Sequence, residues 1–500
     1  MIQVTFAVWL QVVASSRLGL LKWTILGHLC LALIFDLYST IFIALLFLIS
    51  GAVFCWAIYY IDSEPNFRRF TLLVLRFIST IIILIYTATL EFSLVGWDGL
   101  GLTSFLLVIY YKSRRSLGRG IITALTNRLG DCFFILILGL VFRTSVSGVV
   151  ITLLLIILRM TKRAQIPFSA WLPAAMAAPT PVRALVHSST LVTAGVYILI
   201  RYSSERITPI ILIGTGTMII AGLRGCVEGD IKKVVALSTL SQLGVMIVAL
   251  GCAHKSLCFF HLVSHAMFKA LLFIAVGTII HSIYGGQEYR SFRKIGILLT
   301  PATFLLASNI SLIGLPFLRG FYSKDAIYEY LAVNSGPAVL FLIGVLLTAA
   351  YSVKIFIRAA SRVKVSRPPA TSLGALSFQL KYPIITLGLF SIIWGQFIRI
   401  EGLPISLVIE SRVKTLTIKA VTIGIIIGSI ISMKVKSNNN SLGRISLLAP
   451  RTQWTASQIS IDPENLESKW ISYSSTYISW YTGILSLFII LALGVIFIEV

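Results

Sequence analysis

Long apolar runs separated by short charged or Gly- and Pro-containing connections make up most of the chain. Many runs approach the ~20 residues that an α-helix needs to cross a bilayer. The pattern predicts an all-α polytopic membrane protein with about 16 transmembrane helices, the first two being the weakest. The predicted spans are residues 2–14, 24–36, 38–60, 71–90, 92–111, 121–142, 148–178, 182–202, 207–224, 232–252, 256–282, 299–333, 336–359, 382–399, 415–433 and 481–498.

Composition excludes a soluble globular protein. Hydrophobic residues make up 57% of the 500 residues and charged residues 12%, against roughly 45–50% and about 25% in soluble proteins. The 42 Lys and Arg outnumber the 18 Asp and Glu, which gives a formal net charge of +24. Because the basic residues lie mostly between apolar runs, they indicate membrane topology and not nucleic-acid binding.

Basic residues accumulate in every second connection. The connections in between contain few basic residues, or contain acids that balance their charge. By the positive-inside rule, the basic connections face the cytoplasm or the mitochondrial matrix. Their basic residues are Arg17, Lys22, Arg68, Arg69, Lys112, Arg114, Arg115, Arg119, Arg224, Lys232, Lys233, Arg290, Arg293, Lys294, Arg358, Arg362, Lys364, Arg367, Lys434 and Lys436.

Two predicted spans are interrupted in the same way. Residues 148–178 and 299–333 each begin as an apolar run and then break at prolines near a lysine, Lys162 in the first and Lys324 in the second. Non-helical backbone is tolerated at membrane depth only where it is buried in protein or lines a wet cavity. A pair of interrupted spans in corresponding halves therefore predicts a transporter built from two inverted repeats, here of five helices each.

This reading divides the chain into six parts. They are N-terminal transmembrane helices in 1–70, a first repeat in 71–202, a second repeat in 207–359, additional spans in 382–433, a lateral segment in 440–480 and a C-terminal anchor in 481–498.

Ionisable side chains recur inside the predicted spans, where each costs at least ~2.5–3.5 kcal/mol at the bilayer centre. The most specific group is His261, His265 and Lys269, which recur every four residues and therefore share one face of a helix. The other candidates are Asp98, Asp131, Lys162, His187, Lys232, Lys324 and Asp325.

These residue types suit a proton relay. Histidine changes charge near neutral pH, and a desolvated lysine is pushed toward that range unless a carboxylate holds it charged. Separating a Lys–Asp pair then favours proton loss from the lysine, whereas an arginine would stay protonated. The constellation therefore predicts a proton pump or an antiporter.

Several candidates outside the His–His–Lys group also have a purely structural interpretation. Asp98 can cap a helix near the interface, and Asp131 can form an ion pair with a neighbouring arginine. Lys162 can extend to the membrane surface if the span boundary differs by a few residues. Lys232 can belong to a basic loop that follows Asp230. His187 can be a hydrogen-bonded core histidine.

Motifs for redox or nucleotide chemistry are not found in the sequence. The six cysteines form no C-x-x-C pair, and no Fe–S spacing, haem-attachment motif or Gly-rich nucleotide loop is present. Redox or ATP chemistry is therefore expected on other chains. The N-terminal stretch has neither the form of a signal peptide nor that of a transit peptide, which predicts no import.

The polar segment 440–480 predicts a lateral amphipathic helix. Asp462, Pro463 and Glu464 have the features of a helix N-terminus: a capping acid, a first-turn proline and an acid that complements the dipole. An apolar stripe follows at Leu466, Trp470, Tyr473 and Tyr477. The helix is expected along the membrane surface on the matrix side.

Six motifs occur in order between about residues 36 and 360: GWDGLGLTSFLL, NRLGD, KRAQIPFSAWLPAAMAAPTPVRALVHSSTLVTAGVYILIRY, DIKKVVALSTLSQLG, HLVSHAMFKALLF and GFYSKDAI. Together they resemble the chain 5 family of antiporter-like membrane subunits in the proton-pumping NADH:ubiquinone oxidoreductase, respiratory complex I. The shorter motifs are weak alone, and the stretches 162–202 and 261–273 are highly specific.

The resemblance implies a role for every candidate except Asp131. Lys162 and Lys324 would lie on the two discontinuous helices, Asp98 would be the acid paired with Lys162, and Lys324 with Asp325 would lie on the exit side. The central relay would consist of His187, Lys232, His261, His265 and Lys269. NADH, FMN, Fe–S clusters and ubiquinone would bind partner subunits and not this chain. The implied partners are other membrane-arm subunits, especially the neighbouring chain 4, and membrane lipids.

Three features depart from the family pattern. Asp98 stands where a glutamate is usual, and a carboxylate shorter by one methylene has less reach toward Lys162. Ala174 replaces the usual acid after the Trp-Leu-Pro triplet. The lateral helix has only residues 440–480 available, which as helix reach at most about 60 Å.

Two other functions compete with a complex I pump subunit located in the mitochondrial inner membrane. One is a subunit of a multi-subunit cation/proton antiporter, and the other is a structural arm subunit with impaired pumping. The alternative location is a bacterial plasma membrane.

Overall fold

The computed structural model describes most of the chain up to Lys434. The described residues are 19–26, 29–61, 64, 66–143, 160–166, 168–169, 171–202, 208–282, 285–289, 299–316, 318–332, 335–360, 381–391 and 411–434. In this part of the chain, ten helices are long and apolar enough to cross a membrane. The prediction of a largely helical polytopic membrane protein is therefore confirmed, and the number of 16 spans stays a prediction. The predicted span 2–14, the lateral segment 440–480 and the anchor 481–498 lie outside the described residues.

The prediction of a transmembrane helix at residues 24–36 is wrong. Strands β1 (Gly19–Leu26) and β2 (Leu29–Phe35) form an antiparallel hairpin there. The apolar run would reach only about 20 Å as helix, short of the ~30 Å hydrocarbon core. It cannot be lengthened toward the C-terminus because Asp36 begins the next helix as its N-cap, accepting a hydrogen bond from the Ser39 backbone.

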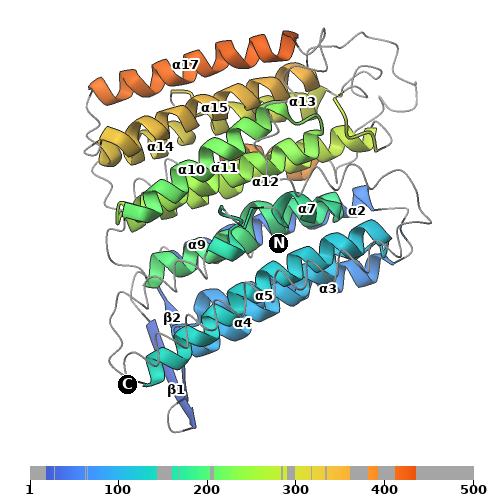
Figure 1. Cartoon of the computed structure of the whole chain (residues 1–500). Coiled ribbons are helices and arrows are strands. Elements are labelled where there is room, and N and C mark those ends of the chain that lie inside the picture. Colours follow the sequence, from blue (N-terminus) through green and yellow to red (C-terminus); the bar gives the residue numbers. More distant parts are fainter. Residues whose placement is uncertain are drawn as a thin grey trace, which may run out of the picture. The chain divides into compact units, whose positions relative to one another are not determined.

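Four long helices follow the hairpin, and the last three of them lie side by side (Figure 1). They are α2 (Leu37–Tyr60), α3 (Phe67–Tyr86), α4 (Leu90–Val108) and α5 (Arg114–Arg143). Their short connections make consecutive helices antiparallel. The predicted spans 38–60, 71–90, 92–111 and 121–142 match these helices to within a few residues at most ends.

The first predicted interruption is present. Residues 160–162 are helical, the chain then turns, and Ala164 has a φ of 55°. A run of short helical pieces follows before the regular helix resumes. The pieces are α7 (Trp171–Ala174), η1 (Ala175–Ala177), α8 (Thr180–Val182), the π-helical η2 (Arg183–Thr190) and α9 (Leu191–Tyr202).

The second interruption separates α13 (Leu299–Ile313) from α14 (Arg319–Ala332). Gly314 has a φ of 84°, a backbone conformation that glycine adopts without the steric cost of a Cβ. A Cβ at this position would lie 3.1 Å from the backbone of Gly320. The Gly-Leu-Pro sequence therefore ends α13 and lets α14 start close beside it.

The remaining helices are α10 (Thr208–Val227), α11 (Ile231–Gly251), α12 (Lys255–Ser282), α15 (Ser335–Ala360), residues 381–391 and α17 (Ser411–Lys434). Burial separates the helices into central and peripheral ones. The apolar windows of α11, α12 and Thr180–Arg201 are completely buried, whereas less than half of the windows of α3, α4, α5 and α17 is buried. The interrupted first segment and two continuous helices thus form the centre, where lipid cannot reach.

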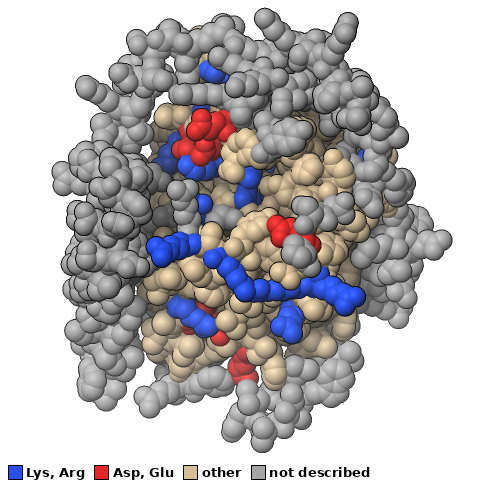
Figure 2. Space-filling view, turned by 90° about the vertical axis from the view of Figure 1, so that its right-hand side faces the viewer, with Lys and Arg blue, Asp and Glu red and all other residues tan. Residues whose placement is uncertain are grey.

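Basic connections gather at one end of the helices. The exposed residues Arg68 and Arg69 lie in the first turn of α3, and the exposed Lys112, Arg114 and Arg119 lie in the connection from α4 and in the first turns of α5. Because α3 and α4 are antiparallel, both groups lie at the same end. Figure 2 views the helix ends at the right of Figure 1, where Lys and Arg side chains cover more of the surface than Asp and Glu. This asymmetry agrees with the positive-inside orientation.

Helix α17 packs against α15 through two glycines one helical turn apart. A Cβ on Gly424 would overlap the carbonyl oxygen of Leu346, and one on Gly428 would lie 2.5 Å from the carbonyl oxygen of Ala350. Small residues spaced by four allow such close approach of helix backbones in membranes. The spacing Gly-x-x-x-Gly therefore fixes where α17 is docked.

We expect G428L to loosen α17 and to destabilise the chain by at least about 1–3 kcal/mol, because the side chain would have to displace the backbone of α15. Thermal unfolding of the detergent-solubilised chain measures the change. The matched control is G216L on α10, where an added Cβ would meet nothing within 4 Å. Equal unfolding temperatures for the two variants would contradict the packing argument.

Candidate functional site

Lys162 lies at the first interruption and is buried, with 2% of its surface exposed. Its Nζ donates a hydrogen bond to the backbone carbonyl of Trp97 at 2.6 Å and lies 3.7 Å from the centroid of the Trp97 ring. A buried ammonium group needs such partners, since an unpaired charge away from water is very unfavourable. The interpretation of Lys162 as a surface-seeking lysine is therefore excluded by its position.

Two acids lie near this lysine and share one arginine. Arg128 Nη1 lies 3.5 Å from Asp131 Oδ2 and 3.8 Å from Asp98 Oδ2. Asp131 also accepts a 2.9 Å hydrogen bond from the indole N–H of Trp97. The ion pair of Asp98 is thus with Arg128, and the acid joined to Lys162 through Trp97 is Asp131. Both interpretations of Asp131, the ion pair and the relay acid, are consistent with this geometry.

The three residues spaced by four on α12 form a fully buried row, as their spacing predicted. His261, His265 and Lys269 are each at most 1% exposed, and the two imidazole centroids lie 6.5 Å apart. Lys269 Nζ donates to the hydroxyl of Ser238 on α11. The row therefore joins α11 and α12 in the most buried part of the bundle.

A serine connects this row to the second interruption. Nδ1 of His261 and Oγ of Ser323 are 2.9 Å apart, and Ser323 directly precedes Lys324 on α14. Lys324 Nζ donates to the carbonyl of Leu312 at 2.6 Å, at the C-terminal end of α13. The lysine thus binds carbonyls that the break leaves without a helical partner. Asp325, which follows it, is also buried.

A small cavity adjoins the second interruption. Its volume is about 40 Å³, and Lys324, Asp325 and residues of the break line one side of it. Thr417 and Val421 of α17 line the other. Water needs roughly 10–15 Å³ of such volume and two or more polar partners. The cavity therefore has room for water beside the Lys324–Asp325 pair.

Several buried polar atoms in this region have no protein hydrogen-bond partner among the described residues. They include Nε2 of His261, both ring nitrogens of His265 and the side-chain amide of Asn309 on α13. Buried polar groups of this kind usually bind ordered water. Their position between the two interruptions suits a hydrated path.

His187 and Lys232 are the remaining predicted members of the central relay. His187 lies in the π-helical segment η2, and Lys232 lies in the first turn of α11, where it is half-buried. Segments of π-helix are rare and, where they occur, are frequently found at functional sites. Among the described residues, no three His, Cys, Asp or Glu side chains form a group that could hold a metal ion.

Sequence reasoning missed Lys354, a buried lysine on α15. Its Nζ donates to the carbonyls of Cys226 and Glu228, each at 2.7 Å, and lies 5.6 Å from the ring centroid of Tyr289. It thereby caps the C-terminal end of α10, where carbonyls lack helical partners and a positive charge is favoured. Lys354 lies within the predicted span 336–359, so the rule that selected the other intramembrane lysines could have found it.

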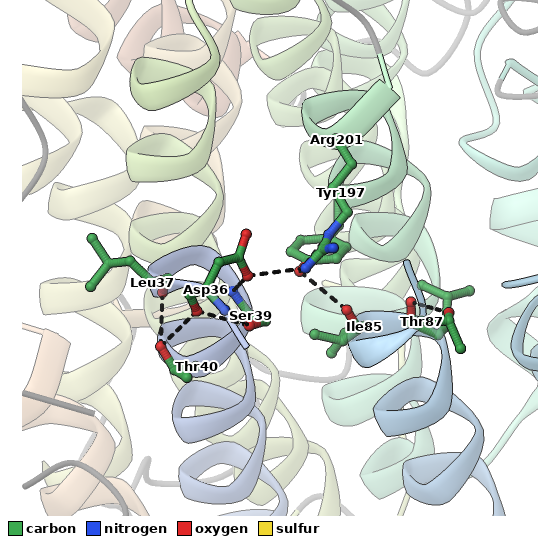
Figure 3. Close-up of polar contacts among 9 residues, drawn as sticks. Asp36, Leu37, Ser39, Thr40, Ile85, Thr87, Tyr197 and Arg201 are labelled. Atoms are coloured by element: carbon green, nitrogen blue, oxygen red, sulfur yellow. Dashed lines mark hydrogen bonds and ion pairs between the residues drawn. The ribbon is translucent and has the colours of Figure 1, made fainter. Parts of the chain in front are cut away.

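A second missed group ties the N-terminal part to α9 (Figure 3). Arg201 Nη2 lies 3.0 Å from Oδ1 of Asp36, and Arg201 Nε donates to the hydroxyl of Tyr197 at 2.9 Å. The Tyr197 hydroxyl donates in turn to the carbonyl of Ile85 on α3 at 3.3 Å. The group therefore links α2, α3 and α9. Nothing in the sequence pairs residues that lie this far apart in the chain.

A bundle with two interrupted helices and buried lysines, histidines and acids between them defines a membrane transporter of the antiporter type. The transmembrane model of the NADH:quinone oxidoreductase/Mrp antiporter family matches residues 88–350. The chain belongs to this family.

Named relatives agree with the motif resemblance to chain 5. The chain is 40% identical over 425 residues to NADH-ubiquinone oxidoreductase chain 5 of Locusta migratoria, covering 80% of this chain and 74% of the relative. It is 42% identical over 369 residues to chain 5 of Lumbricus terrestris, covering 69% and 64%. The predicted resemblance is confirmed.

Two solved structures share the fold. The Mrp complex from Dietzia sp. DQ12-45-1b contains a chain that superposes with a TM-score of 0.73 at 20% identity, over 96% of this chain and 59% of that chain. A chain of the membrane-bound sulfane sulfur reductase, an archaeal respiratory membrane complex, gives 0.69 at 19% identity, over 86% and 91%.

We expect K354M to destabilise the chain by about 2–4 kcal/mol, because the buried carbonyls at the end of α10 lose their donor. The unfolding temperature of the detergent-solubilised chain is the measurement. K419M, at an exposed position on α17, is the control for removing a lysine charge. A K354M chain as stable as K419M would show that water replaces the lysine at no cost.

Proposed function

We propose that the chain is a proton-translocating membrane-arm subunit of an NADH:ubiquinone oxidoreductase. The observation that carries this proposal is the series of buried ionisable groups that follows the middle of the helices from Asp131 and Lys162 to Lys324. Burying an ionisable group inside the membrane costs free energy, so such groups are expected where they move protons or bind ions. Both the family and the chain 5 relatives support the assignment.

The proton path runs through the centre of the bundle. Lys162, with Asp131 and Asp98, forms the first station, and the row on α12 forms the second. Lys324 with Asp325 forms the last station, next to the water-sized cavity. His187 and Lys232 complete the relay between the first two stations. The two interrupted helices belong to two inverted five-helix repeats, 71–202 and 207–359, and the energy for translocation comes from quinone reduction on other subunits.

Redox cofactors belong to the partners in this proposal. NADH, FMN, Fe–S clusters and ubiquinone bind other subunits, and this chain contacts membrane-arm subunits, including the neighbouring chain 4, together with lipid. The partly exposed apolar faces of α3, α4, α5 and α17 are surfaces for these contacts. The location is the mitochondrial inner membrane, since the named relatives are animal chains of a respiratory enzyme.

A cation/proton antiporter subunit is the second candidate, because the fold of the Mrp complex chain is shared. That chain extends well beyond the region this chain covers. The two functions differ in what they need: the antiporter exchanges a cation for protons, whereas the oxidoreductase subunit couples proton flux to electron transfer.

The deciding variant is K162M, which keeps most of the length of the side chain and removes the ammonium group that carries the proton. We expect the assembled complex in liposomes to lose proton translocation through this chain, so that the ratio of protons moved to electrons transferred falls. K419M is the control. An unchanged ratio in K162M would favour a structural arm subunit, and a sodium-dependent flux would favour the antiporter.

The hydrogen bond between the second and last stations gives a further prediction. S323A removes the hydroxyl that contacts His261, and the loss of about 1 kcal/mol should slow proton transfer roughly fivefold. Proton uptake by the reconstituted complex is the measurement. The control is S264A on α12, whose hydroxyl only donates to a backbone carbonyl of its own helix. Equal rates for S323A and S264A would remove Ser323 from the path.

A further inference from the structure

Trp97 contacts Asp131 and Lys162 of the first station with different parts of one residue. The indole N–H donates to Asp131 Oδ1 at 2.9 Å. The face of the ring lies 3.7 Å from Lys162 Nζ, and the backbone carbonyl of Trp97 accepts from the same ammonium at 2.6 Å. The side chain is completely buried, on α4 beside Phe134 of α5. Trp97 therefore lies between Asp131 and Lys162, and it directly precedes Asp98 in the chain.

Each of the two contacts is strongest when its partner is charged. An ionised carboxylate accepts a stronger hydrogen bond than a neutral carboxyl group, so the indole N–H is held most firmly when Asp131 is charged. The ring face stabilises Lys162 only while the lysine is an ammonium ion. The orientation of the indole is thus favoured most when both partners are charged.

We propose that Trp97 is a positioning residue that couples the protonation of Asp131 to that of Lys162. The inference rests on the proposed function and adds a residue to its first station. A proton that arrives on Asp131 neutralises the carboxylate and weakens its hydrogen bond to the indole N–H. The indole then no longer holds its face against the Lys162 ammonium, which favours transfer of the lysine's proton to the next station.

Other charges act on the same pair and must be considered in any pH experiment. Asp98 on α4 and Arg128 on α5 have electrostatic interactions with both Asp131 and Lys162. Neither contacts the indole N–H in the way that Asp131 does, so a change at Trp97 leaves the Asp98–Arg128 ion pair in place. Its effect on pH dependence therefore reports on the Asp131 and Lys162 contacts.

The test measures proton translocation by the assembled complex in liposomes between pH 5 and pH 9. The variant W97F keeps an aromatic face toward Lys162 and removes the N–H donor. We expect the pH below which translocation is lost to rise by about one unit, because a hydrogen bond to a charged group is worth roughly 1.5–3 kcal/mol. W97L removes the ring face as well and should also move the alkaline limit of the profile to lower pH.

The matched control is W56F. Trp56 is as fully buried as Trp97, and its indole N–H has no hydrogen-bond partner among the described residues. A purely structural role for Trp97 predicts that W97F and W56F both lower the amount of assembled complex and leave the pH profile unchanged. That result would overturn the proposal.

A second comparison tests the route through Asp131. If Trp97 acts through this acid, W97F should change nothing further in a D131N background, whereas independent effects would overturn the proposal. If W97F fails to assemble, W97L also lacks a donor, so the same shift of the acidic limit is expected for it. K162M separates the two hypotheses, since unchanged translocation in K162M would refute the proposed function itself.

Discussion

The structure depends on one constraint, which is that a charge inside a membrane protein must have a partner supplied by the protein or by water. Four buried lysines among the described residues meet it with neutral partners from the protein. Lys162 binds a carbonyl and a ring, Lys269 binds a hydroxyl, and Lys324 and Lys354 bind carbonyls at helix ends. Three of these lysines use backbone carbonyls, and the carbonyl that Lys324 binds lacks a helical partner because α13 ends at the second interruption. At that position the break and the lysine require each other.

The helices were predictable because hydrocarbon thickness and the helical rise set the length of an apolar run. The interruptions were predictable because proline and glycine beside a lysine cannot continue a lipid-facing helix. The row on α12 was predictable from the period of the helix alone. The hairpin before Asp36 was missed because composition identifies an apolar segment but does not distinguish a short helix from a pair of strands.

The partners of the candidate residues were not predictable, since they come from elements far apart in the chain. Trp97 lies 65 positions from Lys162, and Ser323 lies 62 positions from His261. Neither residue belongs to a type that intramembrane charge rules select. The expected pairing of Asp98 with Lys162 came from a resemblance in which a glutamate stands at this position. With the shorter aspartate, the ion pair is with Arg128 and the neighbouring tryptophan lies against the lysine.

Asp36 illustrates how strictly a membrane bundle can specify one side chain. Its carboxylate accepts a hydrogen bond from the first turn of α2 and also neutralises Arg201 on α9. Asparagine would retain the first function and leave a partly buried guanidinium without its counter-ion. Glutamate would retain the charge, but it is a poor helix cap because its longer side chain does not fold back onto the N-terminal N–H groups. Only aspartate meets both demands, so a substitution at position 36 costs stability unless Arg201 is replaced as well.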